Sequence, residues 1–361
     1  MMTIDGKVMV TGGAGYIGSH TVLQLLEAGQ AVVVFDSFSN SKPEAVRRVR
    51  KLAAETLACA VEAVPLTLIE GDIRDASALA KLFHAHNDIE AVIHFAGLKA
   101  VAESVQQPLR YYDNNVVGTV RLLEAMAAAA VYRLVFSSSA TVYGDPYAVP
   151  IREDFPLHAT NPYGASKLHI EGMLRDLHAS APEQWQIAIL RYFNPVGAHA
   201  SGEIGEDPNG VPNNLMPYIA QVASGKLLQL KIFGSDYPTP DGTGVRDYIH
   251  VEDLAHGHWL ALTRLARGTA AMRGEASGSL VTVNLGTGTG YSVLDMLKAF
   301  ELAAERVIPY ELVARRPGDV AQCYAEPGLA WQELGWRAQK DQADMCRDHW
   351  RWQSRNPGGF I

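Results

Sequence analysis

Cysteine is scarce in this sequence, with three in 361 residues and no paired spacing among them: Cys59, Cys323 and Cys346. This pattern excludes a disulfide-stapled secreted scaffold and a cysteine-based zinc site, and it indicates a reducing cytoplasm. The histidines do not supply a metal set either. His84 and His86 are two apart and His250 lies in a predicted strand-to-helix turn, so we expect structural histidines and no bound metal.

Long apolar runs and excess positive charge are also missing. The longest apolar stretch, residues 126–131, is far shorter than the roughly 20 residues of a membrane span, and no signal-peptide pattern precedes the first apolar strand. The net charge of -8 argues against nucleic acid or an anionic membrane as the main partner. It leaves room for a local basic pocket that binds a small anion. We expect a soluble, cytoplasmic protein.

A glycine-rich turn follows the first apolar strand, which is predicted at 7–11. The turn, GGAGYIG at 12–18, leads into an apolar-periodic helix through Leu26, and a second apolar strand at 31–35 ends at Asp36. Glycines between a strand and a helix are the context that a dinucleotide fingerprint needs. Gly12 would form the turn, Gly15 would admit the diphosphate and Gly18 would let the helix pack closely. A carboxylate at Asp36 favours NAD over NADP, because it accepts hydrogen bonds from the ribose and repels a 2′-phosphate.

Further strand-like runs are predicted at 66–69, 91–95, 134–138 and 187–190, with helical stretches between them. This alternation predicts an α/β fold with a doubly wound, parallel, Rossmann-type sheet and a smaller α+β lobe after it. Ligands of such sheets collect at the carboxyl ends of strands. Candidate residues follow the predicted strands there: Asp72, Ala96, Gly97, residues 137–139, Tyr192 and Phe193. Residues 50–65 are predicted as a longer helix or loop, and 269–279 as a surface loop.

Tyr163 and Lys167 lie four residues apart in a segment of helical composition, 163–178. Residues at this spacing share one helix face, so the phenol and the ammonium project in the same direction. A free tyrosine, with a pKa of about 10, is a poor base at neutral pH, but a nearby cation favours the phenolate. The pair therefore predicts a general base tuned by Lys167 together with a bound nicotinamide cation.

Several long motifs carry a family resemblance: HFAGLKAV at 94–101, YYDNN at 111–115, SSSATVYG at 137–144, RYFNPVGA at 191–198, PNNLMP at 212–217, DGTGVRDYIHV at 241–251 and WRWQ at 350–353. With the glycine-rich turn and the Tyr/Lys pair, the chain resembles the UDP-glucose 4-epimerase family of extended short-chain dehydrogenases/reductases, nearly end to end. The resemblance implies reversible C4 epimerisation of UDP-glucose and UDP-galactose through a transient 4-keto sugar and enzyme-bound NADH. It implies that Tyr163 is the base, that Ser139 hydrogen-bonds the 4-oxygen and that Lys167 holds the nicotinamide ribose.

The resemblance also implies two domains and two sets of binding residues. Residues 1–195 would bind NAD and 196–361 the UDP-sugar, with some later segments packing back onto the first domain. The cofactor set is Gly12, Gly15, Tyr16, Ile17, Gly18, Asp36, Asn40, Ser41, Asp72, Ile73, Phe95, Ala96, Gly97, Lys99, Asn114, Tyr163, Lys167 and Tyr192. The substrate set is Lys99, Ser139, Ala140, Thr141, Tyr163, Phe193, Asn194, Asn214, Leu215, Phe233, Arg246, Tyr248, Arg316, Asp319 and Cys323. Helices of the first domain would form a homodimer contact.

Arg246 and Arg316 are the best diphosphate ligands on chemical grounds, because a guanidinium binds phosphate bidentately. Cys323 bears on substrate breadth. Family members carry either a bulky Tyr or a small residue here, and a small side chain leaves room for a 2-acetamido group. We therefore expect activity on UDP-N-acetylglucosamine and UDP-N-acetylgalactosamine as well.

Two other functions would be compatible with this fold, and the sequence provides evidence against each. A nucleotide-sugar 4,6-dehydratase would share the fold, the cofactor and the Tyr/Lys pair, but related dehydratases carry an Asp-Glu pair where this chain has Ala140 and Thr141. A non-catalytic NAD-sensing module would be expected to lack Ser139, Tyr163 or Lys167, and all three are present. Both alternatives are therefore disfavoured.

Overall fold

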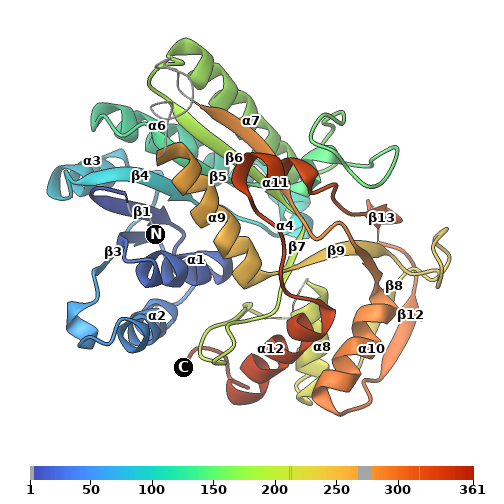
Figure 1. Cartoon of the computed structure of the whole chain (residues 1–361). Helices are drawn as coiled ribbons and strands as arrows, with labels where there is room; N and C mark the ends of the chain where they lie inside the picture. Colours follow the sequence, from blue (N-terminus) through green and yellow to red (C-terminus); the bar gives the residue numbers. More distant parts are fainter. Residues whose placement is uncertain (1–3, 211, 213, 267–278, 317) are drawn as a thin grey trace.

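The structure, a computed structural model, describes residues 4–210, 212, 214–266, 279–316 and 318–361. It shows a large sheet covered by helices and a smaller lobe built around three further helices (Figure 1). The surface loop predicted at 269–279 falls outside the described residues except for Ser279, and so does Asn213 of the PNNLMP motif.

Seven parallel strands form the large sheet, in the order β3-β2-β1-β4-β5-β6-β10. The strands are β1 (Lys7–Thr11), β2 (Ala31–Asp36), β3 (Leu66–Glu70), β4 (Ile89–His94), β5 (Arg133–Ser139), β6 (Gln186–Tyr192) and β10 (Leu280–Leu285). Their near-continuous apolar sequences suit strands that are buried on both faces. The predicted doubly wound parallel sheet is confirmed.

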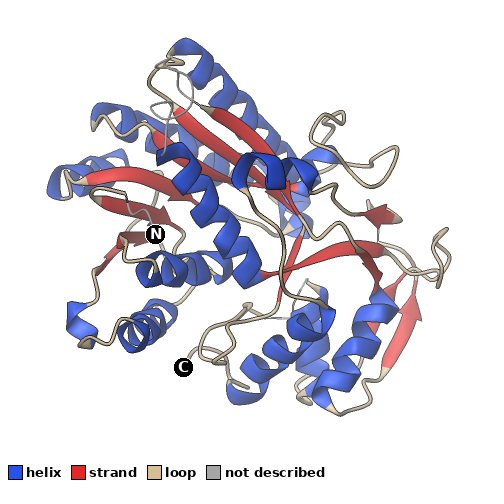
Figure 2. Cartoon of the chain, in the orientation of Figure 1, coloured by secondary structure: helices blue, strands red, loops and turns tan. Residues whose placement is uncertain are grey.

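Helices cover both faces of this sheet (Figure 2). One face packs against α1 (Tyr16–Glu27), α2 (Pro43–Thr56), α9 (Val251–Ala266) and α11 (Gly328–Leu334). The other packs against α3 (Ala76–Ala85), α6 (Gly118–Ala128) and α7 (Pro162–Ser180). Strand β1 feeds both cores, because successive side chains point to opposite faces: Val8 and Val10 join the first core and Met9 joins the second.

Short helical segments connect the main elements. They are η1 (Val61–Ala63), α4 (Val101–Gln106), α5 (Pro108–Tyr111), the π-helical η2 (Tyr112–Val117) and η3 (Ala140–Tyr143). None of the helices in the described part of the chain combines the length and the apolar character that crossing a bilayer requires.

The smaller lobe is made of short strands and three helices. Strand β9 (Val245–His250) pairs with β7 (Asn194–Val196), β11 (Gly290–Ser292) and β13 (Gln322–Cys323), and β8 (Leu230–Phe233) pairs with β12 (Tyr310–Val313). Helices α8 (Leu215–Ala223), α10 (Val293–Ala304) and α12 (Gln342–Arg355) enclose a core that includes Met216, Phe300 and Met345.

The chain crosses between the two lobes more than once. Strand β9 of the smaller lobe continues directly into α9, which packs on the large sheet, and β10 then pairs in parallel with β6. Segments beyond residue 196 therefore belong to both lobes. These crossings fix the smaller lobe over the carboxyl ends of the large sheet, where a ligand site is expected.

Candidate active site

A cavity of about 780 Å³ lies between the two lobes, within the usual size of small-ligand sites. Its wall includes Gly12 after β1, Asp36 at the end of β2, Phe95 after β4 and Ser139 at the end of β5. Arg246 of the smaller lobe faces the same space. The cavity therefore joins the carboxyl edge of the parallel sheet to the second lobe, as the strand-end residues predicted.

The glycine-rich turn forms one end of this cavity. Gly12 has a φ of 69°, and a Cβ there would lie 2.7 Å from the Ala96 nitrogen. A Cβ on Gly18 would lie 2.3 Å from the Gly12 oxygen, so α1 rests directly against the turn. Gly15 lines the cavity, and its Cβ would meet only the Gly12 oxygen, at 3.2 Å. No side chain of the described chain caps α1, so its free N–H groups suit a bound diphosphate.

Asp36 is held in one orientation by three hydrogen bonds. Its Oδ2 accepts from the Ala14 nitrogen at 2.9 Å, and its Oδ1 accepts from the Phe38 nitrogen at 2.9 Å and from Ser41 Oγ at 2.8 Å. Ser41, predicted as a cofactor ligand, does not line the cavity, whereas Asn40 does. The structure thus places Ser41 behind Asp36, where it orients the carboxylate.

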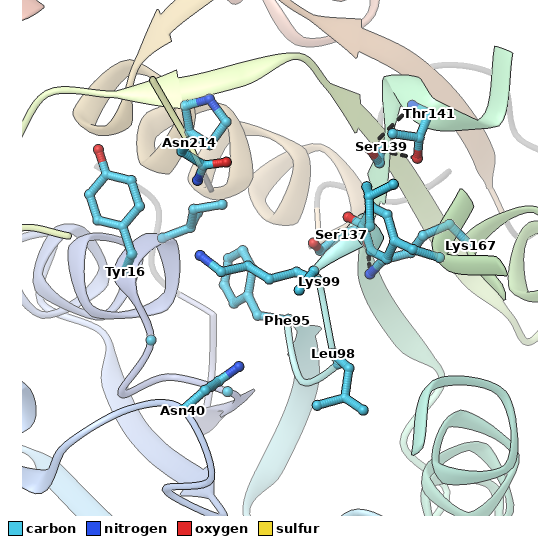
Figure 3. A pocket seen from close by; sticks show the side chains of 18 of the residues that line it. Tyr16, Asn40, Phe95, Leu98, Lys99, Ser137, Ser139, Thr141, Lys167 and Asn214 are labelled. Atoms are coloured by element: carbon cyan, nitrogen blue, oxygen red, sulfur yellow. Dashed lines mark hydrogen bonds between the residues drawn. The ribbon is translucent and has the colours of Figure 1, made fainter. Parts of the chain in front are cut away.

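Tyr163 and Lys167 lie on the first turns of α7 and both line the cavity. The Asn161 side chain caps this helix by accepting from the Gly164 nitrogen at 2.9 Å. Lys167 Nζ donates to the Ser137 carbonyl at 2.7 Å (Figure 3). Its ammonium lies 4.9 Å from the centre of the Phe136 ring. The predicted shared helix face therefore brings both side chains to the end of β5.

Ser139 ends β5 beside this pair. Its Oγ accepts from the Thr141 nitrogen at 3.2 Å and from Thr141 Oγ1 at 3.0 Å (Figure 3). Burial raises the pKa of Tyr163, and the nearby Ser139 hydroxyl opposes that rise. Burial also lowers the pKa of Lys167 to about 8, against the opposing charge of Glu171. These side chains alone therefore favour a protonated phenol, so a lowered tyrosine pKa needs a further positive charge nearby.

A buried ion pair links the helix of Lys167 to the large sheet. Glu171, one turn after Lys167, accepts from Ser138 Oγ at 2.6 Å and from Arg191 Nη2 at 2.6 Å. The Arg191 and Glu171 side chains are 1% and 0% exposed. Glu171 thus links α7 to Ser138 of β5 and to Arg191 of β6, the residues that precede Ser139 and Tyr192.

Arginines line the cavity wall on the side of the smaller lobe. Arg246 projects from β9, and Cys323 pairs with it in register on β13. The Arg316 guanidinium lies 3.8 Å from the centre of the Phe233 ring, and Asp319 follows it on the wall. Burial raises the pKa of Cys323 to about 11, so it is a neutral thiol at neutral pH.

Most of the predicted residues meet in this one cavity. Those that line it are Gly12, Gly15, Tyr16, Ile17, Gly18, Asp36, Asn40, Asp72, Ile73, Phe95, Ala96, Gly97, Lys99, Asn114, Ser139, Ala140, Thr141, Tyr163, Lys167, Tyr192, Phe193, Asn194, Asn214, Arg246, Arg316, Asp319 and Cys323. Ser41, Leu215, Phe233 and Tyr248 do not line it. Tyr248 packs in the core of the smaller lobe and Phe233 supports Arg316, so both lie one layer behind the wall.

The sequence analysis did not identify two residues of this region. Asn161 precedes Pro162 and Tyr163, and an Asn-Pro start is a recognisable helix N-cap signal. Glu206 lines the cavity and is buried. No local pattern marks it, because one partner of its carboxylate, Lys99, lies 107 positions earlier in the sequence.

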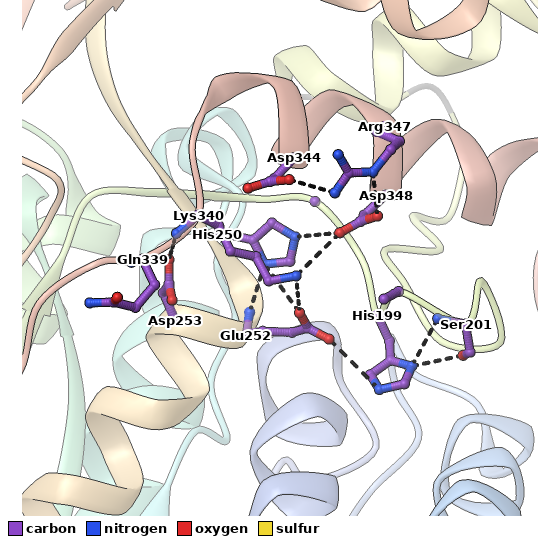
Figure 4. Close-up of polar contacts among 12 residues, drawn as sticks. His199, Ser201, His250, Glu252, Asp253, Gln339, Lys340, Asp344, Arg347 and Asp348 are labelled. Atoms are coloured by element: carbon purple, nitrogen blue, oxygen red, sulfur yellow. Dashed lines mark hydrogen bonds and ion pairs between the residues drawn. The ribbon is translucent and has the colours of Figure 1, made fainter.

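His250, Glu252 and Asp348 form a group with metal-ligand chemistry in the described part of the chain, their ligand atoms lying within 4.8 Å of one another. A lysine side chain of the protein pairs with the two carboxylates of this group (Figure 4). Lys340 Nζ lies 2.6 Å from a Glu252 oxygen and 3.3 Å from an Asp348 oxygen. Asp348 also pairs with Arg351. The group is therefore a charge-balanced contact between α9 and α12.

Comparisons with known proteins place this geometry in a family. Residues 8–273 match the NAD dependent epimerase/dehydratase family. A UDP-glucose 4-epimerase of Bacillus subtilis is 57% identical over 353 residues, which cover 98% of each chain, and one of Dictyostelium discoideum is 56% identical over 360 residues, covering 100% and 99%. This chain belongs to the UDP-glucose 4-epimerase family. The crystal structure of a UDP-glucose 4-epimerase from Bifidobacterium longum, in complex with NAD+ and UDP, has a TM-score of 0.89 and 48% identity, over 99% of this chain and 100% of that one.

The cavity has the features that the cofactor of this family requires. A dinucleotide needs a helix N-terminus free of capping side chains and a ribose acceptor, and the turn before α1 and the oriented Asp36 provide both. The residues present therefore fit NAD.

Proposed function

We propose that this protein interconverts UDP-glucose and UDP-galactose by reversible oxidation at C4, with NAD as its cofactor. The observation that carries the proposal is the convergence of Tyr163, Lys167 and Ser139 on one cavity, between the glycine-rich turn and Arg246. NAD, when bound, supplies the acceptor and donor of the C4 hydride. We also propose a division near residue 195: the first part carries the cofactor residues with Tyr163 and Ser139, and the second part carries Arg246, Arg316 and Asp319 for the UDP portion.

The cofactor residues act by position and by charge. The turn from Gly12 to Gly18 and the start of α1 would hold the diphosphate, and Asp36 would accept from the adenosine ribose. Lys167 would bind the nicotinamide ribose from the adjacent wall.

Tyr163 and Ser139 are proposed to transfer the proton of the sugar 4-hydroxyl. Tyr163 takes the proton of the sugar 4-hydroxyl, and Ser139 hydrogen-bonds the 4-oxygen and relays the proton. Burial keeps the pKa of the Tyr163 phenol high, whereas positive charge beside a phenol stabilises its anion. The base is thus active only when cationic charge is close to it, which restricts proton removal to the loaded site.

The UDP portion is proposed to bind at Arg246, Arg316 and Asp319. The two guanidinium groups would pair with the diphosphate, and Asp319 would accept from the uridine ribose. Firm anchoring at UDP leaves the 4-keto sugar free to turn in the cavity, and hydride then returns to its other face.

Cys323 is proposed to admit 2-acetamido sugars. Its small side chain lies on the cavity wall opposite Arg246 in the strand register. We expect turnover of UDP-N-acetylglucosamine by the native protein. Cys323→Tyr should abolish that turnover and spare UDP-glucose, as measured by assaying both sugar pairs side by side. A native protein that is inactive on the acetamido sugar would refute this role.

A homodimer is also proposed, formed through helices of the large lobe. Apolar side chains on α5 and η2 are exposed outside the cavity wall: Leu109, which is 81% exposed, and Val117. Burial of such side chains against a second copy would be favourable. We also propose a location in the cytoplasm, with which the scarcity of cysteine agrees.

The proposal is tested with UDP-galactose and purified protein without added NAD. UDP-glucose should form without net release of NADH. Tyr163→Phe should lower turnover by several orders of magnitude while UDP and NAD still bind in calorimetry. Near-normal turnover would overturn the role of Tyr163, and a dehydrated sugar product would favour the dehydratase alternative.

A further inference from the structure

Glu206 is a buried acid on the cavity wall, in the segment between β7 and α8. The backbone around it is fixed from behind. Trp352 Nε1 donates to the Glu206 carbonyl at 3.0 Å. The next residue, Asp207, pairs with Lys42 at 2.8 Å and accepts from the Phe360 nitrogen at 2.9 Å. The carboxylate therefore projects into the cavity from a rigid support.

One oxygen of Glu206 serves both halves of the site. Oε1 accepts from Asn214 Nδ2 at 3.0 Å and lies 3.5 Å from Lys99 Nζ. Asn214 precedes α8 of the smaller lobe, and Lys99 follows β4 of the large sheet. The loop that carries Lys99 is anchored, because Asn115 binds both the nitrogen and the oxygen of Leu98, at 2.8 and 3.0 Å. Figure 3 shows the Lys99 ammonium reaching toward the side of the cavity where Asn214 lies.

The other oxygen, Oε2, is buried without a hydrogen-bond partner in the described part of the chain. A buried acid in a cavity that receives two diphosphates is electrostatically costly. Asp36, by comparison, has all its contacts within the cofactor edge. Glu206 instead contacts one residue of each lobe, Asn214 and Lys99. The free-energy cost of burying its charge is therefore offset by these two contacts, which connect the lobes.

We propose that Glu206 is a positioning residue that couples substrate binding to cofactor binding, by holding the Lys99 ammonium and the Asn214 amide on one carboxylate. This inference rests on the proposed function. Removal of the negative charge alone, in Glu206→Gln, leaves an acceptor for Asn214 and frees Lys99. The ammonium is then no longer held between the two ligands, so UDP stabilises bound NAD less.

The test measures KM and kcat for UDP-galactose and the rate at which the NAD-loaded protein loses NAD, with and without UDP. We expect Glu206→Gln to raise KM about tenfold, to change kcat less than about threefold, and to reduce the protection of NAD by UDP about tenfold, a typical coupling. In a Lys99→Met background the same substitution should have less than about a twofold effect, because its partner is already gone.

Glu203→Gln is the matched control. It removes the same charge three residues away, outside the cavity wall, and should behave as the native protein does. Equal effects of Glu206→Gln in the native and Lys99→Met backgrounds, or unchanged KM and NAD protection, would overturn the proposal. If Glu206→Gln folds poorly, Glu206→Asp decides, because it keeps the charge but draws the carboxylate back from Lys99 and Asn214; it should also reduce the protection of NAD by UDP, and unchanged protection would overturn the proposal. NAD protection requires no turnover, so failure of the epimerase assignment remains distinguishable.

Discussion

Two glycines of the turn before α1 should respond differently to the same added methyl group: Gly18→Ala mainly in stability and Gly15→Ala mainly in cofactor binding. A Cβ on Gly18 would lie 2.3 Å from the Gly12 oxygen and 2.8 Å from the Gly13 Cα, so α1 must move away from the turn. We expect Gly18→Ala to lower the free energy of unfolding by about 1–3 kcal/mol, the usual cost of overpacking. Gly15 has an ordinary φ of -72°, and its Cβ would meet only the Gly12 oxygen, at 3.2 Å. Because Gly15 is the N-cap of α1, where alanine is less favourable than glycine, Gly15→Ala should lower the free energy of unfolding by less than about 1 kcal/mol.

Cofactor binding should separate the same two variants. Gly15 lines the cavity where the diphosphate would approach the backbone, so we expect the methyl group of Gly15→Ala to weaken the Kd for NAD at least tenfold, about 1.4 kcal/mol. Urea unfolding of nucleotide-free protein gives the stabilities, and calorimetric titration gives the Kd. Native-like NAD affinity in Gly15→Ala would refute the placement of the diphosphate. Native-like stability in Gly18→Ala would refute the packing argument.

Two further predictions concern buried charges near Tyr163. Burial lowers the pKa of Lys167 from 10.5 to about 8, so between these pH values the unfolded chain binds more protons than the folded chain. The free energy of unfolding of the native protein should therefore rise by about 3 kcal/mol from pH 8 to 10.5, relative to that of Lys167→Met. A difference between the two proteins that stays constant with pH in urea unfolding would contradict this. Glu171→Ala leaves the buried Arg191 guanidinium without its partner and should cost about 3–5 kcal/mol of unfolding free energy, whereas Asp154→Ala, which breaks an exposed pair with Arg152, should unfold as the native protein does.

Local patterns predicted the strands of the large sheet well. The apolar runs at 7–11, 31–35 and 187–190 became β1, β2 and β6 with small changes at their ends, because strands buried on both faces need continuous apolar sequence. Strand β10 was not predicted: its apolar run is interrupted by Thr282 and Asn284, and it joins the edge of this sheet after the chain has passed through the smaller lobe. Nothing in a local sequence states which of two sheets a strand will join.

The site divides in the same manner. The spacing of Tyr163 and Lys167 predicted their shared helix face, because helix geometry alone sets it. The pKa of Tyr163 could not be read from that spacing, since burial dominates it. Tyr248 belongs to the motif at 241–251, and Ser41 and Phe233 are implied by the family resemblance. Neither source distinguishes a wall residue from the residue behind it. Glu206 depends on contacts across more than a hundred residues, which no short pattern records.

The central claim is that the hydride taken from C4 returns to the same sugar without leaving the site. The most direct measurement supplies UDP-galactose deuterated at C4 to purified protein without added NAD, and follows the label in the product by mass spectrometry and NMR. The account predicts UDP-glucose that keeps the deuterium at C4, with none in the solvent. Loss of the label to water, or its appearance at another carbon, would contradict it.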